Sequence, residues 1–237
     1  INCVLLVILR MTKTILKSNE LSMIPDIRYI HFLGGETLYD PAFYALCDKL
    51  IETGVAKHII VGTTTNGTIF DSRLERLISS FKEFHLGISI ESVTPLNDYI
   101  RYPSKIEQVL ENIDKFLKLY ESCGLRLTLR ITPNIFTISE IDRVFEYMID
   151  KNIIAESCNI LTNPAQLKIE LLPEDIRQET ITKLQRLIDK YDLERTNIVN
   201  TRRPDLVQDV IANLIFEYKT FLETYTVPDN ADELRYQ

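Results

Sequence analysis

The sequence predicts an α/β fold built on a parallel sheet, and two observations lead to it. From residue 27 onward, short runs rich in β-branched and aromatic residues alternate with amphipathic helical segments. The segments between these runs are too long for hairpins, so successive strands must pair in parallel through right-handed crossovers. We expect strands at residues 27–33, 58–64, 84–90, 125–131 and 153–161, with helices between them.

The expected helices begin at recognisable signals. Asp40 stands as an N-cap before Pro41, and three serines each precede an acidic residue three positions later, as in a capping box. The serines are Ser72, Ser104 and Ser139. After residue 164 the pattern changes: "LKIELLP" reads as a strand or an extended arm, and two further helices are expected at about 173–190 and 204–225.

Composition limits the possible functions. With 237 residues, of which 45% are hydrophobic and 26% charged, the chain is an ordinary globular protein. A formal charge of −7 and a pI near 5.1 weigh against nucleic acid as a partner. The apolar stretch at residues 3–9 is too short to span a bilayer, so no membrane partner is expected. Four widely spaced cysteines form no CxxC, which favours a reduced, cytoplasmic setting.

Candidate functional residues follow the strands, because ligands of parallel α/β folds bind at the carboxyl ends of the strands. After the first strand come Gly34, Gly35 and Glu36. Glycines let a ligand lie against the backbone, and a carboxylate next to them suits an amino group; the alternative is a tight turn with a solvated glutamate. The three histidines lie within strands or at their starts, so we interpret them as structural, and no metal site is predicted.

Several of these segments occur in a familiar order. "YIHFLGGETL" resembles the second-strand segment of radical S-adenosylmethionine (radical SAM) proteins, "IIVGTTTNGT" is similar to their third-strand ending, and "LGISIES" is similar to their fourth-strand ending. "YIRYPSKIEQVLENI" resembles the arginine-bearing loop and helix that follow. The resemblance covers roughly residues 25–163, and residues 164–237 are similar, more weakly, to a twitch-type extension.

The resemblance implies a fold and a set of roles. The fold would be a partial (β/α)6 TIM-like barrel at 25–163, with a remnant or irregular segment at 1–24 and a mostly helical extension at 164–237. Gly34, Gly35 and Glu36 would hold the amino group of S-adenosylmethionine. Ser89, Glu91 and Arg101 would face its ribose and carboxylate, and Asn66 and Asn134 would be wall residues. The substrate, a peptide or a small metabolite, is not indicated, and a flavodoxin or ferredoxin would donate electrons.

One feature of the family is missing from this sequence. The CxxxCxxC that binds a [4Fe-4S] cluster is absent, and the first β/α unit of the barrel is not recognisable. We therefore expect a fragment of a radical SAM enzyme, whose cluster ligands are not in this chain and whose complete form would generate a 5′-deoxyadenosyl radical. The alternatives are a degenerate, non-catalytic barrel that binds a small ligand or a partner protein, and an unrelated α/β enzyme with similar loops.

Overall fold

The computed structural model describes residues 5–10, 27–195 and 207–235. By its internal contacts the chain divides into two compact units. Unit 1 comprises Ile1–Ser89 and Glu107–Thr128, and unit 2 comprises Ile90–Ile106 and Leu129–Gln237. The predicted domain limits at residues 24 and 163 concern the family domain, and they stay predictions.

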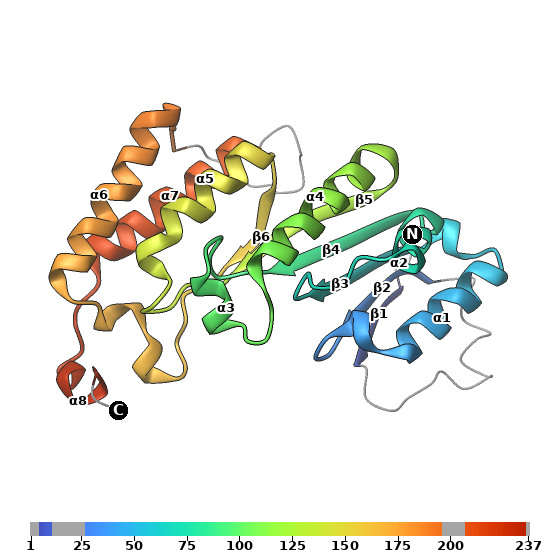
Figure 1. The fold of residues 1–237 in the computed structure, drawn as a ribbon, viewed down its shortest axis with the longest axis horizontal. Coiled ribbons are helices and arrows are strands. Elements are labelled where there is room, and N and C mark those ends of the chain that lie inside the picture. The colour runs from blue at the N-terminus through green and yellow to red at the C-terminus, as the bar shows by residue number, and fades with distance from the viewer. Residues whose placement is uncertain (1–4, 11–26, 196–206, 236–237) are drawn as a thin grey trace. The chain divides into compact units, whose positions relative to one another are not determined.

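Unit 1 is built on parallel strands that follow one another in chain order (Figure 1). They are β1 (Leu5–Arg10), β2 (Ile27–Leu33), β3 (Ile60–Thr65), β4 (Glu83–Ser89) and the first half of β5 (Leu125–Ile131). The α/β class with parallel strands is thereby confirmed. β1 is an addition to the predicted strands: it lies in the segment expected to be a remnant, and residues 11–24 of that segment lie outside the described part of the chain.

The helices of unit 1 follow their strands as predicted. They are α1 (Pro41–Glu52), α2 (Ser72–Ser80) and α4 (Ile106–Ser122), whose first residue belongs to unit 2. Asp40 caps α1 by accepting a hydrogen bond from Ala42 N, as expected. The predicted cap of α2 was wrong by one residue: Asp71 accepts from Leu74 N, and Ser72 is the first helical residue. An aspartate with extended backbone directly before the helix took the place predicted for the serine.

One face of the unit 1 sheet is covered by these helices. Phe32 of β2 meets Phe43 of α1 edge to face, with ring centroids 4.9 Å apart, and both side chains are fully buried. The other strands point Val61, Phe84 and Leu86 into the same core. The alternate residues of β2 and β4 are polar and half-buried, so these strands have one apolar face and one polar face.

In its described residues, unit 2 contains the end of β5, the strand β6 (Ile154–Cys158) and several helices. These are α3 (Leu96–Ile100), α5 (Ile141–Lys151), α6 (Glu174–Tyr191), α7 (Val207–Thr224) and α8 (Ala231–Arg235). The helical C-terminal region is confirmed. The short helix α3 was not predicted. The prediction of a strand or an extended arm for "LKIELLP" was wrong, because this region forms short 3-10 turns at Ala165–Leu167 and Ile169–Leu171. Its apolar residues Ile169 and Leu171 are buried by turns instead of by a strand.

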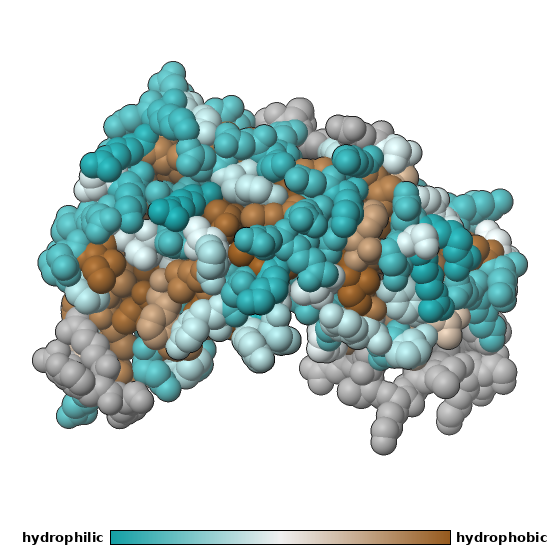
Figure 2. Space-filling view, in the orientation of Figure 1, coloured by the Kyte–Doolittle hydropathy of each residue, from teal (hydrophilic) through white to brown (hydrophobic). Residues whose placement is uncertain are grey.

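The helices of unit 2 pack through both apolar and polar contacts. Phe145 of α5 packs against Tyr218 of α7, and Arg177 of α6 donates from Nε to the carbonyl of Leu222 near the end of α7, at 2.6 Å. Hydrophilic side chains cover the visible side of α6, at the upper left of Figure 2. Among the helices of the described part, none combines the length and apolar character that crossing a bilayer requires.

Candidate functional site

The Glu36 carboxylate is the centre of the candidate site in unit 1. It follows β2 and caps the 3-10 turn Thr37–Tyr39 by accepting from Leu38 N at 3.3 Å. From the end of β3, the Thr65 hydroxyl donates to Glu36 Oε1 at 2.7 Å and Asn66 N donates to Oε2 at 2.6 Å. Within the described part of the chain these donors carry no formal charge, and Glu36 forms no ion pair. Its charge therefore has no balancing cation there.

The local geometry does not require a glycine at position 35. Neither Gly34 nor Gly35 has a positive φ, a conformation that is confined to Gly54 and Gly67 among the described glycines. A Cβ built on Gly35 would meet no atom within 4 Å. The explanation of a tight turn that requires glycine thus finds no support at Gly35, and both residues are exposed beside the Glu36 carboxylate.

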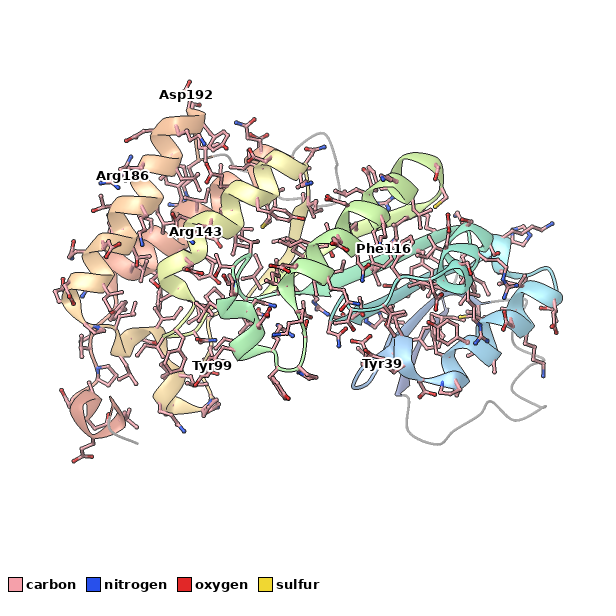
Figure 3. All side chains as sticks on the ribbon, in the orientation of Figure 1. Tyr39, Tyr99, Phe116, Arg143, Arg186 and Asp192 are labelled. Atoms are coloured by element: carbon pink, nitrogen blue, oxygen red, sulfur yellow. The ribbon has the colours of Figure 1, made fainter. Side chains whose placement is uncertain are left out.

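Asn66 organises the turn after β3. Its side-chain Oδ1 accepts from both the backbone N and the hydroxyl of Thr68, so its amide oxygen is used within the loop. Tyr39, which is labelled in Figure 3 and 61% exposed, places its hydroxyl 3.1 Å from the Thr68 hydroxyl. The predicted residues Glu36 and Asn66 are therefore brought together, through the Asn66 backbone. Ser89 ends β4, half-buried, in the same unit.

Sequence reasoning missed Asn112, a buried residue of α4. Its Nδ2 donates to the Gly67 carbonyl at 2.9 Å, which holds the turn after β3 in place. The signal was available: Asn112 is a polar residue on the apolar stripe of its helix, next to Val109 and Ile113.

In unit 2, Glu91 and Arg101 form an ion pair. Arg101 Nη2 lies 2.5 Å from Glu91 Oε1, and Thr132 N donates to Glu91 Oε2 at 2.7 Å. The Glu91 carboxyl is 5% exposed, and this burial raises its pKa, although the positive charge of Arg101 acts in the opposite direction. Both residues were predicted to face a ligand; in the structure each has a partner inside the chain.

Asn97 was also missed, since the short helix α3 that carries it was not predicted. Its Oδ1 accepts from Glu91 N at 2.9 Å, so α3 fixes the turn after β4. Two buried donors in this region, Asn97 Nδ2 and Arg101 Nε, have no hydrogen-bond partner among the described residues. Because an unpaired buried donor costs about 1–3 kcal/mol, these two atoms are candidate contacts for an acceptor on a ligand.

Asn134 has a local role in the loop after β5. Its Oδ1 accepts from Phe136 N at 2.9 Å, and its own N donates to the Thr137 hydroxyl. The residue is buried, and these bonds shape the turn that leads into α5. Nothing in this geometry assigns the side chain to a ligand, so its predicted place as a wall residue stays a prediction.

The residues present do not fit an iron–sulfur cluster. The sequence has no CxxxCxxC, and within the described ranges no group of three His, Cys, Asp or Glu side chains could hold a metal ion. Cys47 is fully buried on α1, and burial raises the pKa of its thiol far above the usual range, which keeps it protonated. The predicted core role of Cys47 agrees with this burial. Cys3 lies outside the described residues.

Comparison with known proteins identifies the family signature. The model of the "Radical SAM superfamily" matches residues 16–148, which is more than half of the 237 residues. No curated protein matches the chain. Among solved structures, the radical S-adenosylmethionine methyltransferase TsrM from Kitasatospora setae, with cobalamin and [4Fe-4S] cluster bound, is 11% identical with a TM-score of 0.45, over 59% of this chain and 29% of that one.

Two further solved structures are similar at the same distant level. The protein anSMEcpe, with bound AdoMet and the Cp18Cys peptide, is 16% identical with a TM-score of 0.48, over 69% of this chain and 46% of that one. SuiB from Streptococcus suis, bound to S-adenosylmethionine, is 15% identical with a TM-score of 0.45, over 74% of this chain and 44% of that one. The chain thus spans less than half the length of each of these structures.

Proposed function

Because this chain belongs to the radical SAM superfamily, we propose that it binds S-adenosylmethionine, with the methionine amino group at Glu36. One observation carries the proposal: the Glu36 carboxylate is held by donors from two strand ends and has no balancing cation in the described part of the chain. A carboxylate accepts about four hydrogen bonds, and three are in use, so one position is left for an ammonium group.

The surroundings of Glu36 support an amino group as its partner. Gly34 and Gly35 expose their backbone beside the carboxylate, and a Cβ at Gly35 would project into open space. Thr65 and Asn66 fix both carboxylate oxygens, so little side-chain entropy is lost when a ligand binds. The roles in ligand binding that the family resemblance implies for Ser89, Glu91, Arg101 and Asn134 remain part of this proposal.

The proposal stops at binding. In the family, a [4Fe-4S] cluster supplies the electron that cleaves S-adenosylmethionine, and the residues of this chain do not provide its three thiolates. The second candidate is a barrel that binds a small ligand without catalysis, and the contacts that hold Glu36 would serve it equally. The residues described here would bind and orient the cofactor in either case.

Calorimetric titration of the chain with S-adenosylmethionine tests the proposal. We expect Glu36→Gln to weaken binding about 10- to 100-fold, since a hydrogen bond to a charged group contributes roughly 1.5–3 kcal/mol. The matched control is Glu52→Gln, an exposed glutamate at the end of α1, which should leave the affinity unchanged.

A second ligand makes the test specific for the amino group. 5′-Methylthioadenosine has the adenosine and sulfur of the cofactor but lacks the amino acid part. Its affinity should be the same for the original chain and for Glu36→Gln. An equal loss of affinity for both ligands would show that the substitution damages the fold instead of the amino-group contact. No binding of S-adenosylmethionine to the original chain would refute the proposal.

A further inference from the structure

The strands of unit 1 carry a polar face that a parallel sheet ordinarily lacks. Parallel sheets are commonly buried on both faces, so their strands are continuously apolar. Here β2 and β4 alternate instead, with one face under the helices and the other half-exposed. The half-exposed face carries Tyr29, His31, Glu83 and His85, and Arg126 of β5 adds a guanidinium. Such a face indicates a surface that meets a polar ligand.

These side chains form one connected group, which we call the Tyr29–Arg126 network. The Tyr29 hydroxyl lies 3.2 Å from His31 Nδ1, and the Tyr29 ring meets the His85 ring edge to face, with centroids 6.0 Å apart. His85 Nε2 lies 3.0 Å from Glu83 Oε2, and Arg126 Nε lies 2.9 Å from the same oxygen. The network therefore runs from β2 to β5 on rigid strands.

Gly62 of β3 makes the network possible. His31, Gly62 and His85 are paired in register across three neighbouring strands. A Cβ on Gly62 would lie 2.5 Å from the Tyr29 hydroxyl oxygen and 2.6 Å from His31 Nδ1, so these two side chains could not keep their positions. The missing side chain lets the rings of β2 and β4 meet over β3, and it explains a glycine in the middle of a strand.

The network has more donors than acceptors. Its one carboxylate, Glu83, accepts from both His85 and Arg126. The pKa of Glu83 is lowered, mainly by the hydrogen bond from His85 and to a smaller extent by the charge of Arg126. The terminal nitrogens of Arg126 and His85 Nδ1 form no hydrogen bond within the part of the chain that the structure describes. Arg126 is also 48% exposed, so its guanidinium can be reached from solvent.

We propose that the Tyr29–Arg126 network is a binding site for the oxyanion group of a small polar molecule, a carboxylate or a phosphate. Arg126 takes the oxyanion with its free nitrogens, His85 Nδ1 donates to it when the ring is protonated, and Glu83 holds both donors in position. The site shares no residue with the proposed S-adenosylmethionine contacts, so it is independent of them.

The three histidines of the chain make a direct test possible. The whole chain, with ¹³C-labelled histidine, gives three imidazole Cε1 signals in an NMR spectrum, which are assigned with His→Gln variants. The probes are inorganic phosphate and succinate, titrated separately. We expect the His85 signal to move saturably with at least one of them, while the signal of the exposed His58, outside the network, stays in place. The anion that binds more tightly identifies the oxyanion class.

A pair of arginine variants completes the test. Arg126→Gln should weaken the saturable effect about tenfold or more. Arg73→Gln is the matched control, because Arg73 is also 48% exposed and lies 2.9 Å from a carboxylate, that of Asp48, outside the network. The proposal is overturned if neither anion moves the His85 signal, if His58 moves as much as His85, or if Arg126→Gln binds as tightly as the original chain.

Discussion

Two carboxylates that each follow a strand, Glu36 in unit 1 and Glu91 in unit 2, are held in opposite ways. Glu36 is half-buried and accepts only from uncharged donors, Thr65, Asn66 N and Leu38 N. Glu91 is almost completely buried and is paired with the Arg101 guanidinium. Both glutamates follow a strand in the sequence. In the described part of the chain, however, only Glu91 is paired with a cation.

The difference has an energetic meaning. A buried carboxylate without a cation loses its hydration and gains little in return, so Glu91 needs Arg101 and the Thr132 N–H. Glu36 is half-buried and keeps part of its hydration. Because its oxygens are already held in position, replacing a bound water by an ammonium group costs little conformational entropy. We therefore expect Glu91 to dominate stability and Glu36 to dominate binding.

The largest effect should come from Glu91→Ala. It leaves the half-buried Arg101 guanidinium, whose Nε has no hydrogen-bond partner among the described residues, without its counterion. We expect the free energy of unfolding to fall by about 3–5 kcal/mol, while Glu36→Ala costs about 1 kcal/mol or less because water can replace the lost oxygens. Urea denaturation followed by circular dichroism measures both, and equal losses would remove the distinction between the two carboxylates.

The glycines beside Glu36 sharpen the comparison. Gly67 has φ 74°, and a Cβ there would lie 2.9 Å from Ile88 Cγ2, so Gly67→Ala should destabilise the fold by roughly 1–3 kcal/mol. Gly35→Ala meets no atom and should change stability by less than about 0.5 kcal/mol, yet weaken S-adenosylmethionine binding. Thermal unfolding and calorimetric titration separate the two effects. A Gly35→Ala chain with unchanged affinity would contradict a ligand lying against this backbone.

Thr65 connects the two strand ends and gives a smaller effect. Its hydroxyl donates to Glu36 and accepts from Gly67 N, and the residue is buried. Thr65→Val keeps the shape but removes the hydroxyl, which should cost about 1 kcal/mol of stability and weaken S-adenosylmethionine binding several-fold. Thr65→Ser keeps the hydroxyl and should restore the affinity. If the Thr65→Val and Thr65→Ser chains bind S-adenosylmethionine equally well, the hydroxyl does not position Glu36.

The sequence predicted most of the strands and helices, but not β1, α3 or the partners of the site side chains. The strand predicted at residues 125–131 matches β5 residue for residue, because apolar and polar side chains alternate there without interruption. The approach of the β3 end to Glu36 follows from the rule that ligand sites collect at the carboxyl ends of parallel strands. The contacts of Glu91 were not predicted, because they come from Arg101, Asn97 and Thr132, which belong to two other segments.

The histidines show that a sequence pattern does not reveal which side chains of neighbouring strands meet. They were predicted to be structural because they lie within strands or at their starts. That position describes a single strand and says nothing about side chains on the neighbouring strands. The Tyr29–Arg126 network appears only when the register of β2, β3 and β4 is known, because it sets His31, Gly62 and His85 in one row. A polar alternation in strands that must be parallel was the available signal, since such strands are ordinarily apolar on both faces.

The smallest effect is a pH dependence of Glu91. Burial raises the folded-state pKa of Glu91 above its ordinary value of 4.5, so the folded chain binds this proton more tightly than the unfolded chain does. The corresponding stability is fully present below pH 4.5 and is lost as the pH rises through the folded-state pKa. The Glu91→Gln side chain does not titrate, so this contribution to the pH dependence of stability is absent from the variant. In urea denaturation at pH values from about 4 to 7, we expect the stability of the original chain relative to Glu91→Gln to fall as the pH rises. The opposite slope would mean that the charge of Arg101 outweighs burial in setting the pKa of Glu91.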